Sequence, residues 1–212
     1  MTLKLYSRYR NSAGQRVRIA LNLKGVDYEY VAVEEMRSDA YRKINPQGLL
    51  PALDIGGRIV GQSTAIIEWL EETYPEPSLF PSDPIDRMTA RSIAQFIACE
   101  IHPIHNHRVR DHLMEDEGWS EEKTMEWYAH WIAKGLTTVE TMLAQRPTPS
   151  TFCVGETPTV ADLYLIPVLG NARWFGFPLD DYPLILGVDA ACAEIDAFRK
   201  AMPDAQPDFP GR

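Results

Sequence analysis

Two residues of a polar segment near the amino terminus, Asn11 and Ser12, have side chains that can stabilise a negative charge. They lie between a predicted strand over Leu3–Tyr6 and a predicted helix over Gln15–Lys24. A hydroxyl or amide beside the positive end of a helix can donate to a thiolate and so lower the pKa of the thiol. Because Ser and Asn are also common helix N-caps, a purely structural cap is the alternative.

A second segment, from Asn45 to Ile67, combines a strand edge with a helix N-terminus. Pro51 lacks an N–H group and therefore starts a strand or lies at a sheet edge, which leaves the backbone of Leu50 without a neighbouring strand. The bond between these two residues is a candidate for the cis form. A glycine pair then predicts a hairpin turn, and Ser63 takes the N-cap position of the next helix. Such an edge beside a helix N-terminus can hold an extended peptide with an anionic group, whereas an ordinary hairpin and capped helix is the alternative.

Three histidines, His102, His105 and His107, lie close together in the sequence and suggest a metal site at first. Pro103 separates the first two, and no Glu or Cys completes a ligand set with a regular spacing. The sequence therefore predicts no metal.

Arg173 follows a mainly apolar helical stretch. A guanidinium among apolar residues needs an anion or a carbonyl partner. A substrate carboxylate would be such a partner, and a structural salt bridge is the alternative.

Composition restricts the class of protein. The net charge of −9 argues against nucleic acid as a partner. We expect no membrane span, because there is no run of about eighteen apolar residues, and no signal peptide precedes the first strand. Three scattered cysteines without metal or redox spacing indicate a reducing compartment, which predicts a cytoplasmic protein.

The pattern of elements predicts an α/β domain followed by an all-helical one. Residues 1–78 read as β-α-β-α-β-β-α, a thioredoxin-like domain, and residues 79–84 form a proline-rich linker. Residues 85–212 are predicted to be a helical bundle. Its expected helices cover residues 86–102, 119–143, 160–169 and 184–201, and the proline-rich tail from Gln206 is expected to be mobile.

Thr159 and Asp162 have the spacing of a capping box at the start of the apolar helix that follows. We assign this pair a structural role and no chemistry.

The segment around Ser12 resembles a motif of the zeta class of cytosolic glutathione transferases. That motif reads roughly Arg-Ser-Ser-Cys-Ser-x-Arg-Val-Arg-Ile-Ala-Leu. The matching positions are Arg10, Ser12 and Arg16 to Leu21, and the departures are Asn11, Ala13 and Gly14. The pairs Leu50-Pro51, Gln62-Ser63 and Tyr182-Pro183 and the triplet Gln206-Pro207-Asp208 also match, so the resemblance covers essentially the whole chain.

The resemblance implies a transferase fold with glutathione as cofactor. Leu50, before a cis-proline at Pro51, would pair with the backbone of the glutathione cysteine, and Gln62 with Ser63 would bind the γ-glutamyl carboxylate and amine. The family's usual contact to sulfur is the first serine of the motif. Asn11 replaces it here, so Ser12 is the first candidate for that contact and Asn11 the second.

The same resemblance implies the remaining site residues. Arg10 and Arg173 would bind the two carboxylates of a dicarboxylic substrate. His105 and Asn106 would contact glutathione, in the same subunit or in the partner of a homodimer, and His107 with Arg108 would line the substrate entrance.

The implied reaction is the glutathione-dependent cis–trans isomerisation of maleylacetoacetate or maleylpyruvate, two substrates between which the sequence does not choose. Aromatic-acid catabolism is the corresponding pathway. One alternative is a glutathione transferase or lyase acting on halogenated or aromatic ether electrophiles, which the altered Asn11-Ser12-Ala13 motif leaves open. Another is a transferase-like binding protein without catalysis.

Overall fold

The computed structural model describes residues 2–211, which form two compact units. The first, called here the N-terminal unit, consists of residues 2–79 and 193–211. The second, the helical unit, consists of residues 80–192. This division differs from the expected one at the carboxyl end, because residues 193–211 belong to the N-terminal unit.

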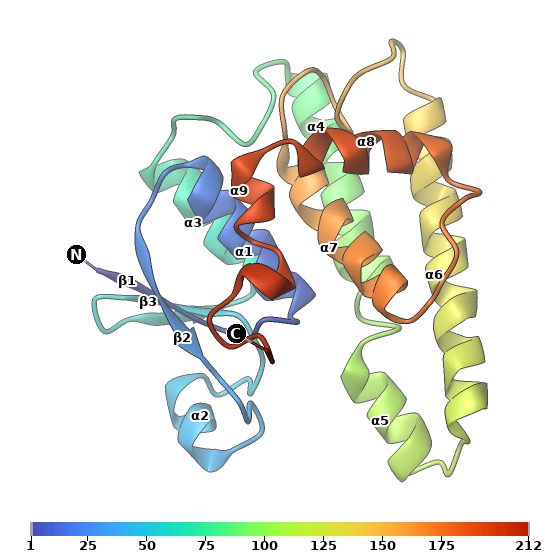
Figure 1. Ribbon diagram of the computed structural model, residues 1–212. Helices are drawn as coiled ribbons and strands as arrows, with labels where there is room; N and C mark the ends of the chain where they lie inside the picture. The colour runs from blue at the N-terminus through green and yellow to red at the C-terminus, as the bar shows by residue number, and fades with distance from the viewer. Residues whose placement is uncertain (1, 212) are drawn as a thin grey trace. The chain divides into compact units, whose positions relative to one another are not determined.

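The N-terminal unit has the predicted β-α-β-α-β-β-α order (Figure 1). Its elements are β1 (Leu3–Ser7), α1 (Ser12–Leu23), β2 (Tyr28–Ala32), α2 (Asp39–Ile44), β3 (Ala52–Ile55), β4 (Ile59–Gly61) and α3 (Ser63–Thr73). The strands form one sheet in the order β2-β1-β3-β4. β1 is parallel to β2 and antiparallel to β3, which is antiparallel to β4. The predicted thioredoxin-like arrangement is thus confirmed.

Alternation along β1 buries every second side chain of that strand. Its Leu5 and Leu53 of β3 are fully buried, as are Ile19 of α1 and Ile66 of α3. Each such side chain stabilises the fold by roughly 1.5–3 kcal/mol relative to exposure. The helices α1 and α3 pack against each other, and this core fixes both of them. Predicted site residues lie at the start of each helix.

The carboxyl end of the chain returns to α1. α9 (Asp196–Arg199) lies beside α1 in Figure 1, and a short 3-10 turn (Pro203–Ala205) follows. The prediction of one continuous helix over residues 184–201 was wrong, because the chain leaves the helical conformation after Ala193 and re-enters it at Asp196.

The prediction of a mobile tail was also wrong. Gln206 is only 3% exposed, and its amide donates to the carbonyl oxygens of Lys200 and Met202, each at 2.8 Å. The tail is therefore part of the folded N-terminal unit.

The helical unit contains five α-helices within residues 80–192 and the residue that follows. They are α4 (Pro84–Phe96), which runs on into a π-helical turn (Ile97–Ile101), α5 (His107–Glu115), α6 (Glu121–Ala144), α7 (Val160–Trp174) and α8 (Pro183–Ala193). Ser120 caps α6 as predicted, since its side chain accepts from the N–H of Lys123. α5 was not predicted as a separate helix.

The predicted capping box opens α7. The fully buried carboxylate of Asp162 accepts from the N–H of Thr159 at 2.7 Å and from the N–H of Cys153 at 2.8 Å. Burial raises the pKa of Asp162, and these hydrogen bonds oppose that shift. The box closes the helix N-terminus and ties it to the preceding loop.

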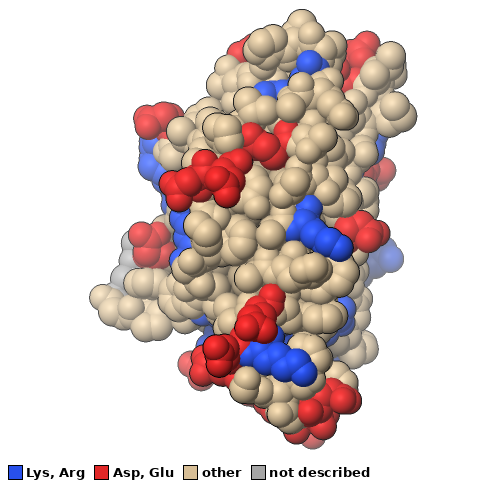
Figure 2. Space-filling model, turned by 90° about the vertical axis from the view of Figure 1, so that its right-hand side faces the viewer, with Lys and Arg blue, Asp and Glu red and all other residues tan. Residues whose placement is uncertain are grey.

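The surface carries both signs of charge. On the face drawn in Figure 2, acidic and basic side chains are scattered between large areas of uncharged surface. Across residues 2–211, no helix combines the length and the apolar character that crossing a membrane requires.

Candidate active site

Asn11 is the N-cap of α1, with extended backbone, and its side-chain oxygen accepts from the N–H of Gly14. Its carbonyl oxygen accepts from the N–H of Gln15 at 2.8 Å, closing the first turn. Ser12 is consequently the first residue of the helix, which begins earlier than the predicted Gln15. The partly buried Ser12 therefore lies at the positive end of α1, and the exposed Arg10 lies in the turn just before it.

The Leu50-Pro51 peptide bond is cis, and the pairing of β3 with β1 and β4 begins at Ala52. Two side chains hold the preceding carbonyl oxygen, that of Leu49. The hydroxyl of Tyr41 donates to it at 2.9 Å and the amide of Asn45 at 2.8 Å. Burial raises the pKa of Tyr41 to about 12, so the hydroxyl stays a donor at neutral pH.

Tyr41 and Asn45 were missed by the sequence analysis. The signal that could have indicated Tyr41 is a large aromatic residue beside the charged Arg42 and Lys43 in a short helix, because a buried tyrosine hydroxyl normally has a partner.

The N-terminus of α3 differs from its predicted form by one residue. Gln62, not Ser63, is the N-cap, and its backbone has a positive φ of 70°, an uncommon value for a residue other than glycine. The Gln62 side-chain amide donates to the side-chain oxygen of Gln47 at 2.6 Å. Ser63 is the first helical residue, and its hydroxyl accepts from the Arg16 guanidinium at 3.3 Å.

These residues are brought together within the N-terminal unit. The register pairs Ala52 of β3 with Gly61 of β4, so the chain just before β3 lies near the chain just after β4. The strand end at Leu50 therefore adjoins the helix start at Gln62 and Ser63. The contact from Arg16 connects that start to α1, whose own N-terminus holds Ser12. A strand edge and two helix N-termini suit an extended, anionic ligand.

The predicted residues of the helical unit have structural partners of their own. His105 is 2% exposed and meets the ring of Tyr128 edge-on, with the centroids 5.1 Å apart. Asn106 caps α5 by accepting from the N–H of Arg108, and its amide lies 3.0 Å from a ring nitrogen of His102.

Arg110 is a partly buried cation that the sequence analysis did not name. Its guanidinium lies 4.3 Å from the ring centroid of Phe175 and 5.8 Å from that of Tyr128. Arg108, which the sequence analysis did name, is exposed, and so is His112, four residues later on α5. A helical periodicity count from Asn106 could have singled out Arg110, four residues later, as a residue on the inward face.

Arg173 forms an ion pair with Asp189 of α8, within the helical unit. Its side chain is 46% exposed, so it is less enclosed by apolar groups than expected. A substrate carboxylate bound at Arg173 would compete with Asp189.

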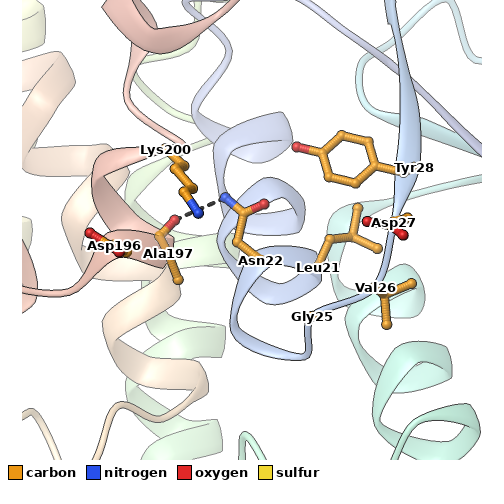
Figure 3. Close-up of a pocket in the computed structure, with 9 residues that line it drawn as sticks. All are labelled: Leu21, Asn22, Gly25, Val26, Asp27, Tyr28, Asp196, Ala197 and Lys200. Carbon is orange, nitrogen blue, oxygen red and sulfur yellow. Dashed lines mark hydrogen bonds between the residues drawn. The ribbon is translucent and has the colours of Figure 1, made fainter.

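Among the described residues, no group of three histidine, cysteine or acidic side chains is placed to hold a metal ion. A cavity of about 300 Å³ lies elsewhere in the N-terminal unit, between the end of α1, the start of β2 and α9 (Figure 3). Its lining includes Asn22, Tyr28 and Lys200 but none of the predicted site residues.

Comparison with known proteins identifies the family of the chain. Residues 5–78 match the glutathione S-transferase N-terminal domain. The chain is 49% identical to a maleylpyruvate isomerase of Ralstonia sp, over 97% of this chain and 99% of that one.

Two solved structures match this chain over nearly the whole length of both proteins. A holo maleylpyruvate isomerase, described as a bacterial glutathione S-transferase of the zeta class, has a TM-score of 0.94 at 49% identity, covering 97% of this chain and 99% of that one. The chain belongs to the zeta class of the glutathione transferases. A maleylacetoacetate isomerase from Methylobacterium extorquens AM1, with bound malonate and glutathione, has a TM-score of 0.94 at 38% identity, covering 98% of this chain and 100% of that one.

Two departures of this zeta-class chain from the motif of its first helix are related to each other. A Cβ atom on Gly14 would lie 2.2 Å from the hydroxyl oxygen of Ser7 and 2.6 Å from the side-chain oxygen of Asn11. Because Ser7 is fully buried, it has little room to move. A serine at position 14 would therefore clash with both the Asn11 cap and Ser7.

Proposed function

We propose that this zeta-class protein is a glutathione-dependent cis–trans isomerase that converts a maleyl 2-oxo acid, maleylacetoacetate or maleylpyruvate, to its fumaryl isomer. The observation that carries the proposal is the 49% identity, over nearly the whole of both chains, to a protein named maleylpyruvate isomerase. The malonate and glutathione bound by a relative of 38% identity support a dicarboxylic substrate and this cofactor.

The residues present fit glutathione. Leu50 lies just before the paired part of β3, where its backbone can pair with that of the glutathione cysteine. Gln62 and Ser63 open α3, whose N-terminus favours the γ-glutamyl carboxylate. Pro51 in the cis form shapes the chain between these two contacts.

Ser12 donates a hydrogen bond to the glutathione sulfur. Its place as first residue of α1 supports this role, since the helix end stabilises the thiolate as well. The side-chain oxygen of Asn11 already accepts from Gly14, so Asn11 acts first as a cap, with its amide N–H groups as the second candidate donor.

Arg10 and Arg173 bind carboxylates of the substrate through forked hydrogen bonds. The exposure of both side chains supports this proposal, and for Arg173 the bond replaces its ion pair with Asp189. Arg110, which lies over Phe175, is a further candidate to bind a carboxylate. Contacts of His105 and Asn106 with glutathione, and of His107 and Arg108 with the entering substrate, stay predictions.

When bound, glutathione supplies a thiolate that adds reversibly to the cis double bond and makes it free to rotate. The chain's own residues make this possible at neutral pH. Ser12 and the end of α1 keep the sulfur ionised, and the arginines orient the carboxylates and stabilise the negative charge that spreads over the substrate in the transition state.

The test is the ultraviolet spectrum of maleylpyruvate or maleylacetoacetate mixed with the purified protein, with and without glutathione. We expect glutathione-dependent formation of the fumaryl product, with a strong loss in Arg173→Ala and none in Arg58→Ala, an exposed arginine of the β3–β4 turn. Glutathione binding without conversion would contradict the proposal and favour a transferase or lyase. Absence of glutathione binding would favour a non-catalytic binding protein.

We further propose a homodimer in the cytoplasm, active in aromatic-acid catabolism. Ile85 and Met88 of α4 support an interface, because they are one helical turn apart and are 68% and 65% exposed. The thiols of Cys99, Cys153 and Cys192 are free, as expected in a reducing compartment. Light scattering with Ile85→Glu and Met88→Glu tests the interface.

A further inference from the structure

Arg18 of α1 is fully buried and connects the carboxyl-terminal segment to the loop before α1. Its guanidinium donates to the carbonyl oxygen of Arg8 at 3.3 Å and to that of Tyr9 at 3.2 Å. It also donates to the carbonyl oxygen of Ala201 at 2.9 and 3.2 Å, and to the hydroxyl of Ser7 at 3.2 Å. Burial lowers the pKa of Arg18 to about 10, so the group stays charged at neutral pH.

Asp208, near the carboxyl terminus, holds the same loop from its other side. One carboxylate oxygen accepts from the N–H of Tyr9 at 2.9 Å, and the other accepts from the hydroxyl of Tyr30 at 2.8 Å. The ring of Phe209 meets that of Tyr9 edge-on, with the centroids 5.5 Å apart. Burial, followed by the hydrogen bond to Asp208, raises the pKa of Tyr30, which keeps its hydroxyl a donor.

Both backbone polar groups of Tyr9 are therefore bound by these two side chains. Tyr9 is followed directly by Arg10 and then by Asn11, the cap that starts α1 at Ser12. A shift of the Tyr9 peptide would therefore displace Arg10, Asn11 and Ser12 as well. A misplacement of about 1 Å at a reacting group can cost on the order of 100-fold in rate.

We infer that Asp208, together with Arg18, is a positioning residue for the thiol-binding loop, so that the carboxyl-terminal segment is a working part of the active site. This inference rests on the proposed function. The charged hydrogen bonds that Asp208 accepts and Arg18 donates are stronger than neutral ones, which suits them to fixing a loop.

The same segment has a second attachment that does not reach the loop. At the cavity of Figure 3, the side-chain amide of Asn22 donates to the carbonyl oxygen of Ala197 at 3.0 Å. Asn22→Ala therefore removes a neutral hydrogen bond to the same segment without touching Tyr9, and it is the control for Asp208→Ala.

The experiment compares wild type, Asp208→Ala, Asp208→Asn and Asn22→Ala by isomerase kinetics and by ultraviolet titration of the thiol of bound glutathione. We expect kcat/KM to fall about 10- to 100-fold in Asp208→Ala, mainly through kcat, with the thiol ionising at higher pH. Asp208→Asn, which keeps an acceptor for the Tyr9 N–H, recovers part of the loss, and Asn22→Ala stays at the wild-type value.

Hydrogen exchange of the peptide covering residues 8–11 gives a readout independent of the reaction. Faster exchange in the Asp208 variants but not in Asn22→Ala supports the inference. Wild-type kinetics and exchange in Asp208→Asn and Asp208→Ala, or equal losses in Asn22→Ala, would overturn it. If Asp208→Ala does not fold, Asp208→Asn decides. Failure of the proposed function itself is recognised separately, because wild type would then lack isomerisation.

Discussion

Both α1 and α7 have a capping side chain at the N-terminus, the N-cap Asn11 in α1 and the N3 residue Asp162 of the capping box in α7, and the two differ in charge and in burial. α7 is closed by the carboxylate of Asp162, which has no exposed surface and binds the N–H groups of Thr159 and Cys153. α1 is closed by the neutral amide of Asn11, which is partly buried, and the next residue, Ser12, is partly buried as well.

This difference separates a structural helix end from one suited to chemistry. A negative charge placed inside α7 uses up the positive helix end, so no anion from outside is needed there. A neutral cap satisfies one N–H group of α1 and leaves its positive end for a thiolate. The charge and burial of the cap therefore indicate which helix start can bind an anion.

The largest effect is expected from removing the buried cap of α7. Asp162→Ala leaves the N–H groups of Cys153 and Thr159 without their acceptor and lowers the free energy of unfolding by about 3 kcal/mol. Chemical denaturation measures the loss. The glutathione affinity of the folded fraction should not change. A selective loss of affinity would contradict the purely structural role of the α7 N-terminus.

The next effect concerns the close approach at the start of α1. Gly14→Ala places a Cβ against Ser7 and Asn11 and should cost about 2 kcal/mol of stability together with weaker glutathione binding. Gly170→Ala in α7 is the control, because a Cβ there meets no atom within 4 Å beyond its chain neighbours and its own helix backbone, and helix propensity improves. Thermal denaturation and calorimetric titration report both quantities. Equal stability in the two variants would contradict the packing argument.

Exchanging the type of cap sharpens the comparison. Asn11→Asp gives the N-terminus of α1 a carboxylate, as Asp162 gives that of α7, and should change the free energy of unfolding by less than about 1 kcal/mol. The added negative charge should nevertheless raise the pKa of the bound glutathione thiol, as seen by ultraviolet titration. An unchanged thiol pKa would show that the end of α1 does not act on the sulfur.

The smallest effect is the pH dependence of the α7 cap. Because the pKa of Asp162 is raised in the folded state, that state binds the proton more tightly than the unfolded one. Its contribution to stability is fully present below the unfolded value near 4 and falls as pH rises through the folded pKa. The stability of wild type relative to Asp162→Asn, measured from pH 3 upward, should therefore decrease. A constant difference would contradict the shift.

Local patterns predicted most of the fold and part of the candidate site. The alternation of β1, the caps Ser120 and Thr159, and the missing N–H of Pro51 are local signals, and each led to the observed element. The position of Asn11 was predicted as well, with its cap role as the stated alternative.

Contacts between residues far apart in the sequence could not be predicted from local patterns. The tail looked mobile from its prolines, but Asp208 binds Tyr9, which is 199 positions away in the chain. The ion pair of Arg173 with Asp189 and the stacking of Arg110 on Phe175 likewise depend on which helices meet. The break after α8 has no proline or glycine to mark it.

The central claim is that Ser12 at the start of α1 ionises the glutathione thiol, and its most direct test is an ultraviolet titration of bound glutathione in wild type, Ser12→Ala and Asn11→Ala. The account predicts a thiol pKa below that of free glutathione in wild type, a clear rise in Ser12→Ala, and a smaller rise in Asn11→Ala accompanied by about 1 kcal/mol of lost stability. A wild-type pKa retained in Ser12→Ala but lost in Asn11→Ala would contradict the assignment and give the role to Asn11.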